Sequence, residues 1–467
     1  MRRRNLLTLA AAGAVAGPGL RTTADAAPAT QTELVFPTGF GWGAATSAYQ
    51  IEGAAKEDGR GPSVWDVFAH EPGRIRNGDT GDVAADHYHR YLGDLDLMKD
   101  LGLTTYRFSM SWSRVLPTGR GAVNPKGLDF YHRLVDGLLA RNIRPVVTLF
   151  HWDTPQALQE LGGWENRDCA KWFADYAHTV FSAFGDAVPV WLTLNEPKTV
   201  VDVGYTAGTH APGKRDRQLA NVVGHHLLLG HGLAVQALRA TGSKSHIGPA
   251  LSLSPTYPAD DSQAAKRQAV TADAEENRRW LDPVLKGRYP QDWLAAQPKD
   301  APVRAAIKDG DLAIIGAKND IMGVNYYGAT TVTGTGARVM KHPTSQATWQ
   351  EIYPDGMFDL LTRIKRDYGD IPLTITENGM ATTNPLQDTD RIAFLRDHLA
   401  AAHRTIQAGV NLESYHLWSL MDNFEWAEGY TQRWGIVHVD FATQRRTHKA
   451  SADWYRSVIA SNSVSQN

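Results

Sequence analysis

The stretch Val190-Trp191-Leu192-Thr193-Leu194-Asn195-Glu196-Pro197 is an apolar run that ends in two polar residues and a proline. A short apolar run bounded by such residues predicts a buried strand, here Val190–Leu194. A second stretch, from Leu373 to Gly379, repeats the pattern and ends its β-rich run with Glu377. Two strands that each end on a carboxylate make these glutamates candidates for one shared site, provided that the fold brings the strand ends together.

Short strands alternate with amphipathic helical patterns through the rest of the chain after about residue 32. The predicted strands are Trp42–Thr46, Thr105–Ser109, Pro145–Phe150, Val190–Leu194, Ile247–Leu251, Ile321–Asn325, Leu373–Thr376 and Glu413–Trp418. Between them, apolar residues recur every three or four positions, as in Phe130, Leu134 and Leu138, and this spacing predicts helices. Eight strand–helix units in succession predict a single (β/α)8 TIM barrel with long βα loops. No linker or shift in composition divides residues 33–460, so we expect one barrel domain there.

Composition and charge exclude several classes of function. The chain has 467 residues, 42% of them hydrophobic, and a formal net charge of -2, which argues against nucleic acid or an anionic membrane as partner. Cys169 is the only cysteine, so no intrachain disulfide or cysteine metal cage is expected. The histidines of His87-Tyr88-His89 and His225-His226 lack a third ligand at a suitable spacing. We therefore expect neither a metal nor another cofactor.

The N-terminus has the features of an export signal. Arg2-Arg3-Arg4 precedes an apolar stretch, Leu6 to Ala16, that is too short to span a bilayer, and Ala24-Asp25-Ala26 offers a cleavage site. We therefore predict a signal peptide over residues 1–26. Arg3-Arg4-Asn5-Leu6-Leu7 resembles the twin-arginine signal, which predicts export of a folded protein to the periplasm or the medium. No later segment is apolar enough to predict a membrane partner after removal of the signal.

Polar and aromatic residues gather where the predicted strands end. They are Gln50, Arg107, His151, Glu196, Asn325, Tyr327, Glu377 and Trp418. In a (β/α)8 barrel the carboxyl ends of the strands form one rim, and the chemistry of such proteins belongs there. Two carboxylates that face each other across a pocket are the minimal apparatus for hydrolysis of a glycosidic bond. The competing interpretation is that each glutamate is merely a solvated residue at a strand end.

Six sequence blocks resemble the signatures of glycoside hydrolase family one, from about Phe36 to about Tyr455. The blocks are Gly41-Trp42-Gly43-Ala44-Ala45-Thr46-Ser47-Ala48-Tyr49-Gln50-Ile51-Glu52-Gly53, Tyr106-Arg107-Phe108-Ser109, Phe150-His151-Trp152-Asp153-Thr154-Pro155, Thr193-Leu194-Asn195-Glu196-Pro197, Gly323-Val324-Asn325-Tyr326-Tyr327 and Asp422-Asn423-Phe424-Glu425-Trp426-Ala427-Glu428-Gly429-Tyr430. The resemblance implies a retaining β-glycosidase, most often a β-glucosidase, which needs no cofactor.

The resemblance also implies a role for individual residues. Glu377 would be the nucleophile and Glu196 the general acid/base, which must begin protonated in order to donate to the leaving group. Arg107 would be the cation that lowers the pKa of Glu377, with Tyr327 donating a hydrogen bond. Asn195 would hold the sugar 2-hydroxyl. The remaining predicted sugar-binding residues are Gln50, His151, Asn325, Trp418, Glu425 and Trp426.

Two positions narrow the class of substrate, but they leave the sugar preference open. In this family a glutamate at position 425 is typical of free-sugar enzymes, whereas phosphoglycosidases carry serine, and Glu196 excludes the thioglucosidase variant with glutamine. We expect cello-oligosaccharides or plant aryl glucosides as substrates. The competing interpretations are a β-galactosidase, a β-fucosidase, a transglycosidase and a non-catalytic sugar-binding barrel. The long loop from Gly328 to Trp349 is predicted to border the leaving-group site, and the sequence leaves the oligomeric state open.

Overall fold

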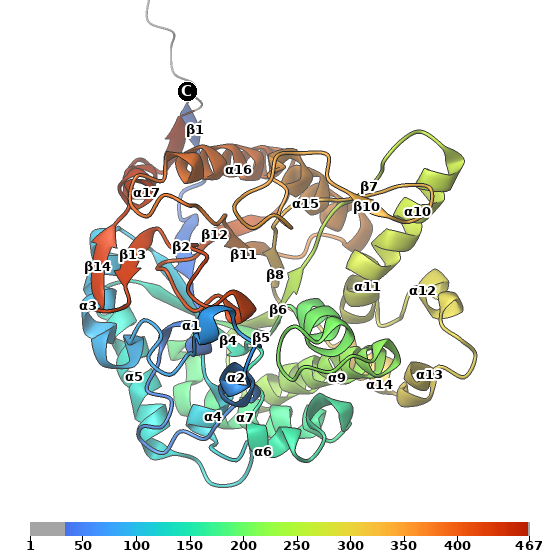
Figure 1. Ribbon diagram of the computed structural model, residues 1–467, viewed down its shortest axis with the longest axis horizontal. Coiled ribbons are helices and arrows are strands. Elements are labelled where there is room, and N and C mark those ends of the chain that lie inside the picture. The colour runs from blue at the N-terminus through green and yellow to red at the C-terminus, as the bar shows by residue number, and fades with distance from the viewer. Residues whose placement is uncertain (1–32, 466–467) are drawn as a thin grey trace, which may run out of the picture.

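Eight parallel strands close into a barrel in the computed structural model, which describes residues 33–465 (Figure 1). Around the barrel the strands follow the order β11 (Leu373–Asn378), β12 (Leu412–Trp418), β2 (Gly41–Ala45), β3 (Thr105–Ser109), β4 (Arg144–Phe150), β5 (Val190–Asn195), β6 (His246–Ser252) and β8 (Met322–Asn325). Each predicted strand is present, with ends that differ by no more than two residues. The predicted (β/α)8 barrel is confirmed.

The barrel closes between its last and first strands, β12 and β2. Their parallel register runs from Ser414 opposite Gly41 to Trp418 opposite Ala45. Glycine is required here, since a Cβ on Gly41 would lie 2.6 Å from Cβ of Ser414 and one on Gly43 would lie 2.5 Å from the His416 ring. Because Gly41 and Gly43 have no side chains, Ser414 and His416 of β12 occupy the space beside them. The two end strands of the sheet can therefore pair and close the barrel.

Helices cover the outside of the barrel in a ring (Figure 1). The long ones are α3 (His87–Asp100), α5 (Pro125–Leu139), α7 (Cys169–Phe184), α9 (Arg217–Thr241), α15 (Pro354–Tyr368), α16 (Thr389–Gln407) and α17 (Ala450–Ser461). The apolar spacing of Phe130, Leu134 and Leu138 places all three on the buried face of α5, because residues three and four apart share one side of a helix. Cys169 is buried at the start of α7, as a packing residue.

Shorter elements lie in the connections and mostly shape the rim. They are α1 (Ala48–Ile51), α2 (Val64–His70), η1 (Arg76–Gly78), α4 (Trp112–Val115), α6 (Gln156–Gln159), η2 (Gly163–Glu165), η3 (Gly185–Ala187), α8 (Pro197–Thr199), η4 (Val200–Ala207), α10 (Gln263–Asp273), η5 (Ala274–Arg278), α11 (Arg279–Lys286), α12 (Gln291–Ala296), α13 (Pro302–Ala306), α14 (Asp311–Ile315) and η6 (Trp426–Glu428). Two small antiparallel pairs join β13 (Val437–Asp440) to β14 (Arg445–His448) and β1 (Glu33–Val35) to β15 (Ser463–Ser465).

The predicted long loop from Gly328 to Trp349 contains more structure than the sequence suggested. It forms β9 (Thr330–Val332) and β10 (Arg338–Val339), which make a three-stranded sheet with β7 (Thr256–Pro258). The β-branched run Thr330-Thr331-Val332 favours this pairing. The ordered sheet gives the rim a fixed wall at this point.

The two ends of the described chain meet, because β15 pairs with β1 beyond residue 460. The predicted signal peptide, residues 1–26, lies outside the described residues. Within residues 33–465, no helix combines the length and the apolar character needed to cross a membrane.

Candidate active site

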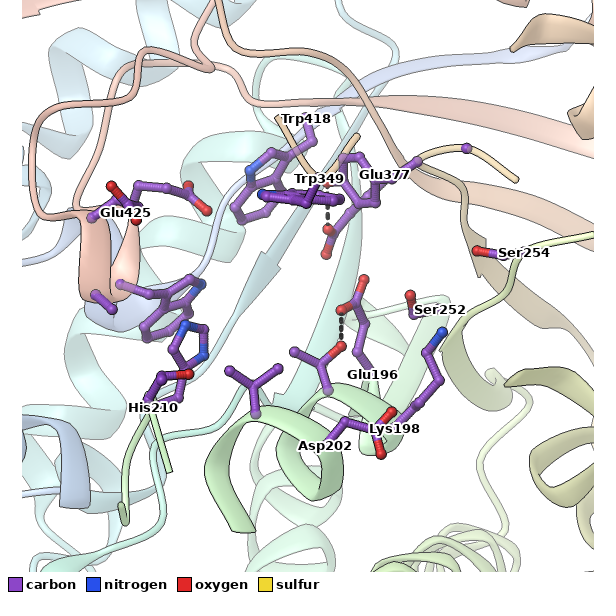
Figure 2. A pocket seen from close by; sticks show the side chains of 18 of the residues that line it. Glu196, Lys198, Asp202, His210, Ser252, Ser254, Trp349, Glu377, Trp418 and Glu425 are labelled. Atoms are coloured by element: carbon purple, nitrogen blue, oxygen red, sulfur yellow. Dashed lines mark hydrogen bonds between the residues drawn. The ribbon is translucent and has the colours of Figure 1, made fainter. Parts of the chain in front are cut away.

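The two predicted catalytic carboxylates point toward each other across one cavity at the carboxyl-end rim of the barrel (Figure 2). Glu196 follows β5 directly, Glu377 lies near the end of β11, and both are buried residues on the wall of a cavity of about 560 Å³. The backbone at Glu196 has φ 45° and ψ 63°, a left-handed conformation that non-glycine residues seldom adopt. This turn directs the chain from β5 into α8 and leaves the carboxyl group over the barrel mouth.

Glu377 is held by one cation and one hydroxyl. Arg107, which is fully buried in β3, places Nη1 2.5 Å from Oε1 of Glu377, and the Tyr327 hydroxyl donates to Oε2 at 2.8 Å. The sequence led us to expect that Arg107 lowers the pKa of Glu377 below its ordinary value. Arg107 and Tyr327 do act to lower this pKa, as expected, but burial and then the nearby Glu196 carboxylate outweigh them, so the pKa rises to about 7 instead of falling below the ordinary value.

Replacement of Tyr327 by phenylalanine is expected to move the acid limb of kcat/KM to higher pH. The Tyr327 hydroxyl stabilises the ionised form of Glu377, so its removal raises a pKa that already lies at about 7. The Tyr327→Phe variant should therefore lose more activity at about pH 6 than at about pH 8, as pH–rate profiles of kcat/KM would show. Tyr257→Phe, which removes a hydroxyl bonded to Asp359 at the surface, serves as the control. Equal loss at every pH would contradict the prediction.

Glu196 accepts two hydrogen bonds, one on each carboxyl oxygen. Nδ2 of Asn325 donates to Oε1 and the Thr199 hydroxyl donates to Oε2, both at 2.7 Å. A hydroxyl can donate to a carboxylate and can also accept from a carboxylic acid, so Thr199 suits a residue that must change its protonation state. The sequence analysis did not single out Thr199. Its position three residues after Glu196, in α8, is the signal that could have identified it.

Asn195 connects the carboxylate pair with His151. Its Oδ1 accepts from Nη2 of Arg107 at 2.6 Å and from Asn325 at 3.0 Å, and its Nδ2 donates to Nε2 of His151 at 2.9 Å. Since Nε2 accepts, the ring proton of His151 lies on Nδ1, a buried atom with no partner among the described residues. The side chain lines the cavity, so this N–H is a donor available to a ligand.

Three further predicted sugar-binding residues line the same cavity, on β12 and on the loop after it. The Trp418 ring stacks against His151 with centroids 5.8 Å apart, and Trp426 packs against Trp152 at 4.6 Å. In the same cavity, Oε2 of Glu425 has no hydrogen-bond partner among the described residues. Burial raises the pKa of Glu425 to about 8. An unpaired carboxyl group beside aromatic faces suits the hydroxyl edge of a sugar ring.

Two further residues predicted to bind sugar form hydrogen bonds within the protein. The Gln50 amide donates to Asn423 and to the Phe424 carbonyl, both at 3.0 Å, so it anchors the segment that leads into Glu425. Nδ2 of Asn325 donates to Asn195 and Glu196, and its Oδ1 accepts from the Thr376 hydroxyl at 2.5 Å. These bonds position Glu196 and the segment that leads into Glu425, two residues that line the cavity, and the binding of sugar by Gln50 and Asn325 stays a prediction.

The described residues contain no group of three or more His, Cys, Asp or Glu side chains arranged to hold a metal ion. The histidine motifs at positions 87–89 and 225–226 belong to networks away from the cavity. His87 bonds Asp94 at 2.7 Å, and His225 bonds Asp311 at 2.9 Å. The first pair lies within α3, the second connects α9 to α14, and none of these four residues lines the cavity.

The (β/α)8 barrel and the two facing carboxylates in a cavity lined by tryptophans place this protein in the class of the O-glycosyl hydrolases. The chain belongs to glycosyl hydrolase family 1, because the model of that family matches residues 32–464.

Several characterised proteins are similar to the chain over nearly its whole length. It is 45% identical over 447 residues to beta-glucosidase A of Acetivibrio thermocellus, a match that covers 92% of this chain and 99% of that relative. It is 43% identical to a bifunctional beta-D-glucosidase/beta-D-fucosidase of Bifidobacterium breve, over 92% of this chain and 99% of the relative. Among solved structures, the beta-glucosidase of Thermotoga maritima in complex with glucoimidazole matches with a TM-score of 0.88 and 42% identity, over 92% and 99% of the two chains.

Proposed function

We propose that this protein is a retaining β-glucosidase that removes terminal β-glucosyl residues through a covalent glycosyl-enzyme intermediate. The observation that supports the proposal most strongly is the asymmetry of the carboxylate pair. Glu377 is bound to a guanidinium and a phenol, which favours the anion that a nucleophile requires. Glu196 is bound to the Asn325 amide and to the Thr199 hydroxyl, which can either donate or accept a hydrogen bond. Such partners suit a residue that gives up and regains a proton.

In the first step, a Glu377 oxygen attacks the anomeric carbon while Glu196 donates its proton to the leaving oxygen. The glycosidic bond breaks, the leaving group departs as an alcohol, and the sugar is esterified to Glu377. Esterification removes the negative charge of Glu377 beside Glu196. In the second step, Glu196 takes a proton from water, the water oxygen bonds to the anomeric carbon, and Glu377 leaves as a carboxylate.

The sugar itself is expected to lie between the carboxylate pair and Glu425. There His151 offers an N–H, Glu425 offers a carboxyl group without a partner, and Trp418 and Trp426 offer apolar faces. Asn195 lies beside Glu196 and is proposed to bind the sugar 2-hydroxyl, a contact that strengthens in the transition state. The relatives named as beta-glucosidases support glucose as the preferred sugar.

Initial rates on nitrophenyl β-glycosides test the sugar preference. The expected order of kcat/KM is glucoside first, then fucoside and galactoside, with mannoside last. Fucoside is placed second because one relative carries both activities in its name. D-Fucose is 6-deoxygalactose: it lacks the 6-hydroxyl of glucose and has an axial 4-hydroxyl, but its ring carbons still offer an apolar face to the tryptophans. A higher kcat/KM on galactoside than on glucoside would reject the assignment as a glucosidase. The assignment as a retaining β-glycosidase would still hold.

We also propose that the protein is exported by the twin-arginine route, as Arg3-Arg4 before an apolar stretch indicates. Outside the cytoplasm it would act on cello-oligosaccharides released during cellulose degradation. The change of Arg3 and Arg4 to lysine is expected to move most of the enzyme activity from the exported fraction to the cytoplasm in a host that has this route. Arg2→Lys alone is the matched control. An unchanged distribution in the double variant would reject the twin-arginine route.

A further inference from the structure

The cavity continues past the carboxylate pair, on the side away from Glu425. Figure 2 shows Glu425 and Lys198 on opposite sides of Glu196, with Ser252 and Ser254 near Lys198. Since the sugar is placed between the pair and Glu425, this second half of the cavity is where the leaving group must lie. The proposed mechanism uses none of Lys198, Ser252 and Ser254.

An ion pair forms the wall of this leaving-group half. Nζ of Lys198 lies 2.6 Å from Oε2 of Glu276, and the two side chains are 13% and 24% exposed. Lys198 is in α8, two residues after Glu196, and Glu276 is in η5, so the pair connects the loops that follow β5 and β6. Both side chains line the cavity. An ammonium has three donors and a carboxylate several acceptor positions, so a single mutual bond leaves both groups able to bind a ligand.

The Glu276 carboxyl group of this wall is ionised at neutral pH. Burial acts to raise the pKa of Glu276, but Lys198, Arg338 and Arg279 together outweigh it and hold that pKa below the ordinary value. An apolar group placed against this wall would remove water from two charges without replacing its hydrogen bonds. Hydroxyl groups would replace them, because they can accept from the ammonium and donate to the carboxylate.

The same cavity also carries an apolar surface, provided by Trp349. This side chain is 55% exposed, and its ring stacks on Trp434 with centroids 6.1 Å apart and an interplanar angle of 26°. Trp349 ends the loop predicted to border the leaving group, and it lies across the cavity from Lys198 (Figure 2). A sugar ring has an apolar face that stacks on an indole and a rim of hydroxyl groups. The combination fits a sugar better than it fits an apolar aryl group.

We propose that the Lys198–Glu276 pair determines leaving-group specificity and selects substrates whose leaving group is itself a sugar. The inference rests on the proposed glucosidase function and, of the two expected classes of substrate, it favours β-linked gluco-oligosaccharides over aryl glucosides. Lys198 donates to the hydroxyl oxygens of the leaving sugar and Glu276 accepts from its hydroxyl groups. An aryl leaving group makes neither contact, so its binding does not depend on the pair.

The test compares kcat/KM for cellobiose with kcat/KM for nitrophenyl β-glucoside. In Lys198→Met the ammonium is lost with little change in side-chain length, and in the double variant Lys198→Met/Glu276→Met no unpaired charge remains. In both variants the value for cellobiose should fall roughly 10- to 100-fold, as expected for the loss of charged hydrogen bonds. The kcat/KM for nitrophenyl glucoside should stay within about twofold of that of the unchanged enzyme, because the pair positions a leaving sugar but does not contact an aryl leaving group.

Lys126→Met is the matched control, since Lys126 pairs with Asp58 at the surface and is 69% exposed. Its substrate ratio should equal that of the unchanged enzyme. An equal loss on both substrates in the double variant, or a lower Tm with an unchanged ratio, would show a purely structural ion pair and overturn the inference. Failure of the proposed function is a different result, since the unchanged enzyme would then hydrolyse neither glucoside.

Discussion

Glu377→Ala is expected to lose nearly all hydrolysis of nitrophenyl β-glucoside and to regain part of it with azide. Without a nucleophile no glycosyl-enzyme forms, and loss of a residue that acts as a catalytic unit costs on the order of 10⁴-fold or more in kcat. The cavity left by the side chain lets azide attack the anomeric carbon directly, from the face that Glu377 would have used. The product should be the inverted α-glucosyl azide, which NMR identifies.

Glu57→Ala is the control for this loss, because Glu57 is half exposed and pairs with His89 at the surface. Its rates should match those of the unchanged enzyme. Hydrolysis by Glu377→Ala at a rate near that of the unchanged enzyme would reject the mechanism. A β-glucosyl azide from this variant would assign the nucleophile to another residue.

Glu196→Ala is expected to show a loss that depends on the leaving group. Nitrophenyl and sugar leaving groups need a proton from Glu196, whereas dinitrophenolate is a good leaving group without one. The variant should therefore form the glycosyl-enzyme from dinitrophenyl glucoside rapidly and hydrolyse it slowly, with a burst of dinitrophenolate and a kcat lower by about 10²- to 10⁴-fold. Azide should accelerate turnover and give the β-glucosyl azide, because Glu377 remains as nucleophile.

Glu71→Ala, a change at a half-exposed residue that pairs with Arg74, is the control for this variant. An equal loss on dinitrophenyl glucoside and cellobiose, without a burst, would show that Glu196 does not act as the acid/base. Opposite azide products from Glu377→Ala and Glu196→Ala would assign the two roles independently of each other.

The fold was predictable because its signals are local. A barrel strand is buried on both sides, so each is a short apolar or β-branched run, and the helices between strands show a regular apolar spacing. The strand ends then identified Glu196, Glu377, Arg107, His151 and Trp418 as rim residues, since all barrel strands end on one side. The resemblance of six sequence blocks to glycoside hydrolase family one then implied a role for several of these rim residues. The short strands β9 and β10 were missed because they have only three and two residues, and because β9 also pairs with β7, which lies far away in the chain.

The sequence by itself determined the class of protein, the pair of carboxylates and most of the residues at the rim, because each depends on neighbours along the chain. Only the tertiary structure decided how those groups behave. The pKa of Glu377 is a balance between burial and the Arg107 charge, and the outcome depends on how much water the folded cavity excludes. The amides of Gln50 and Asn325 meet partners far away in the chain, which no local pattern indicates. The Lys198–Glu276 wall joins two loops that no sequence pattern connects, because a long-range ion pair leaves no periodic signal.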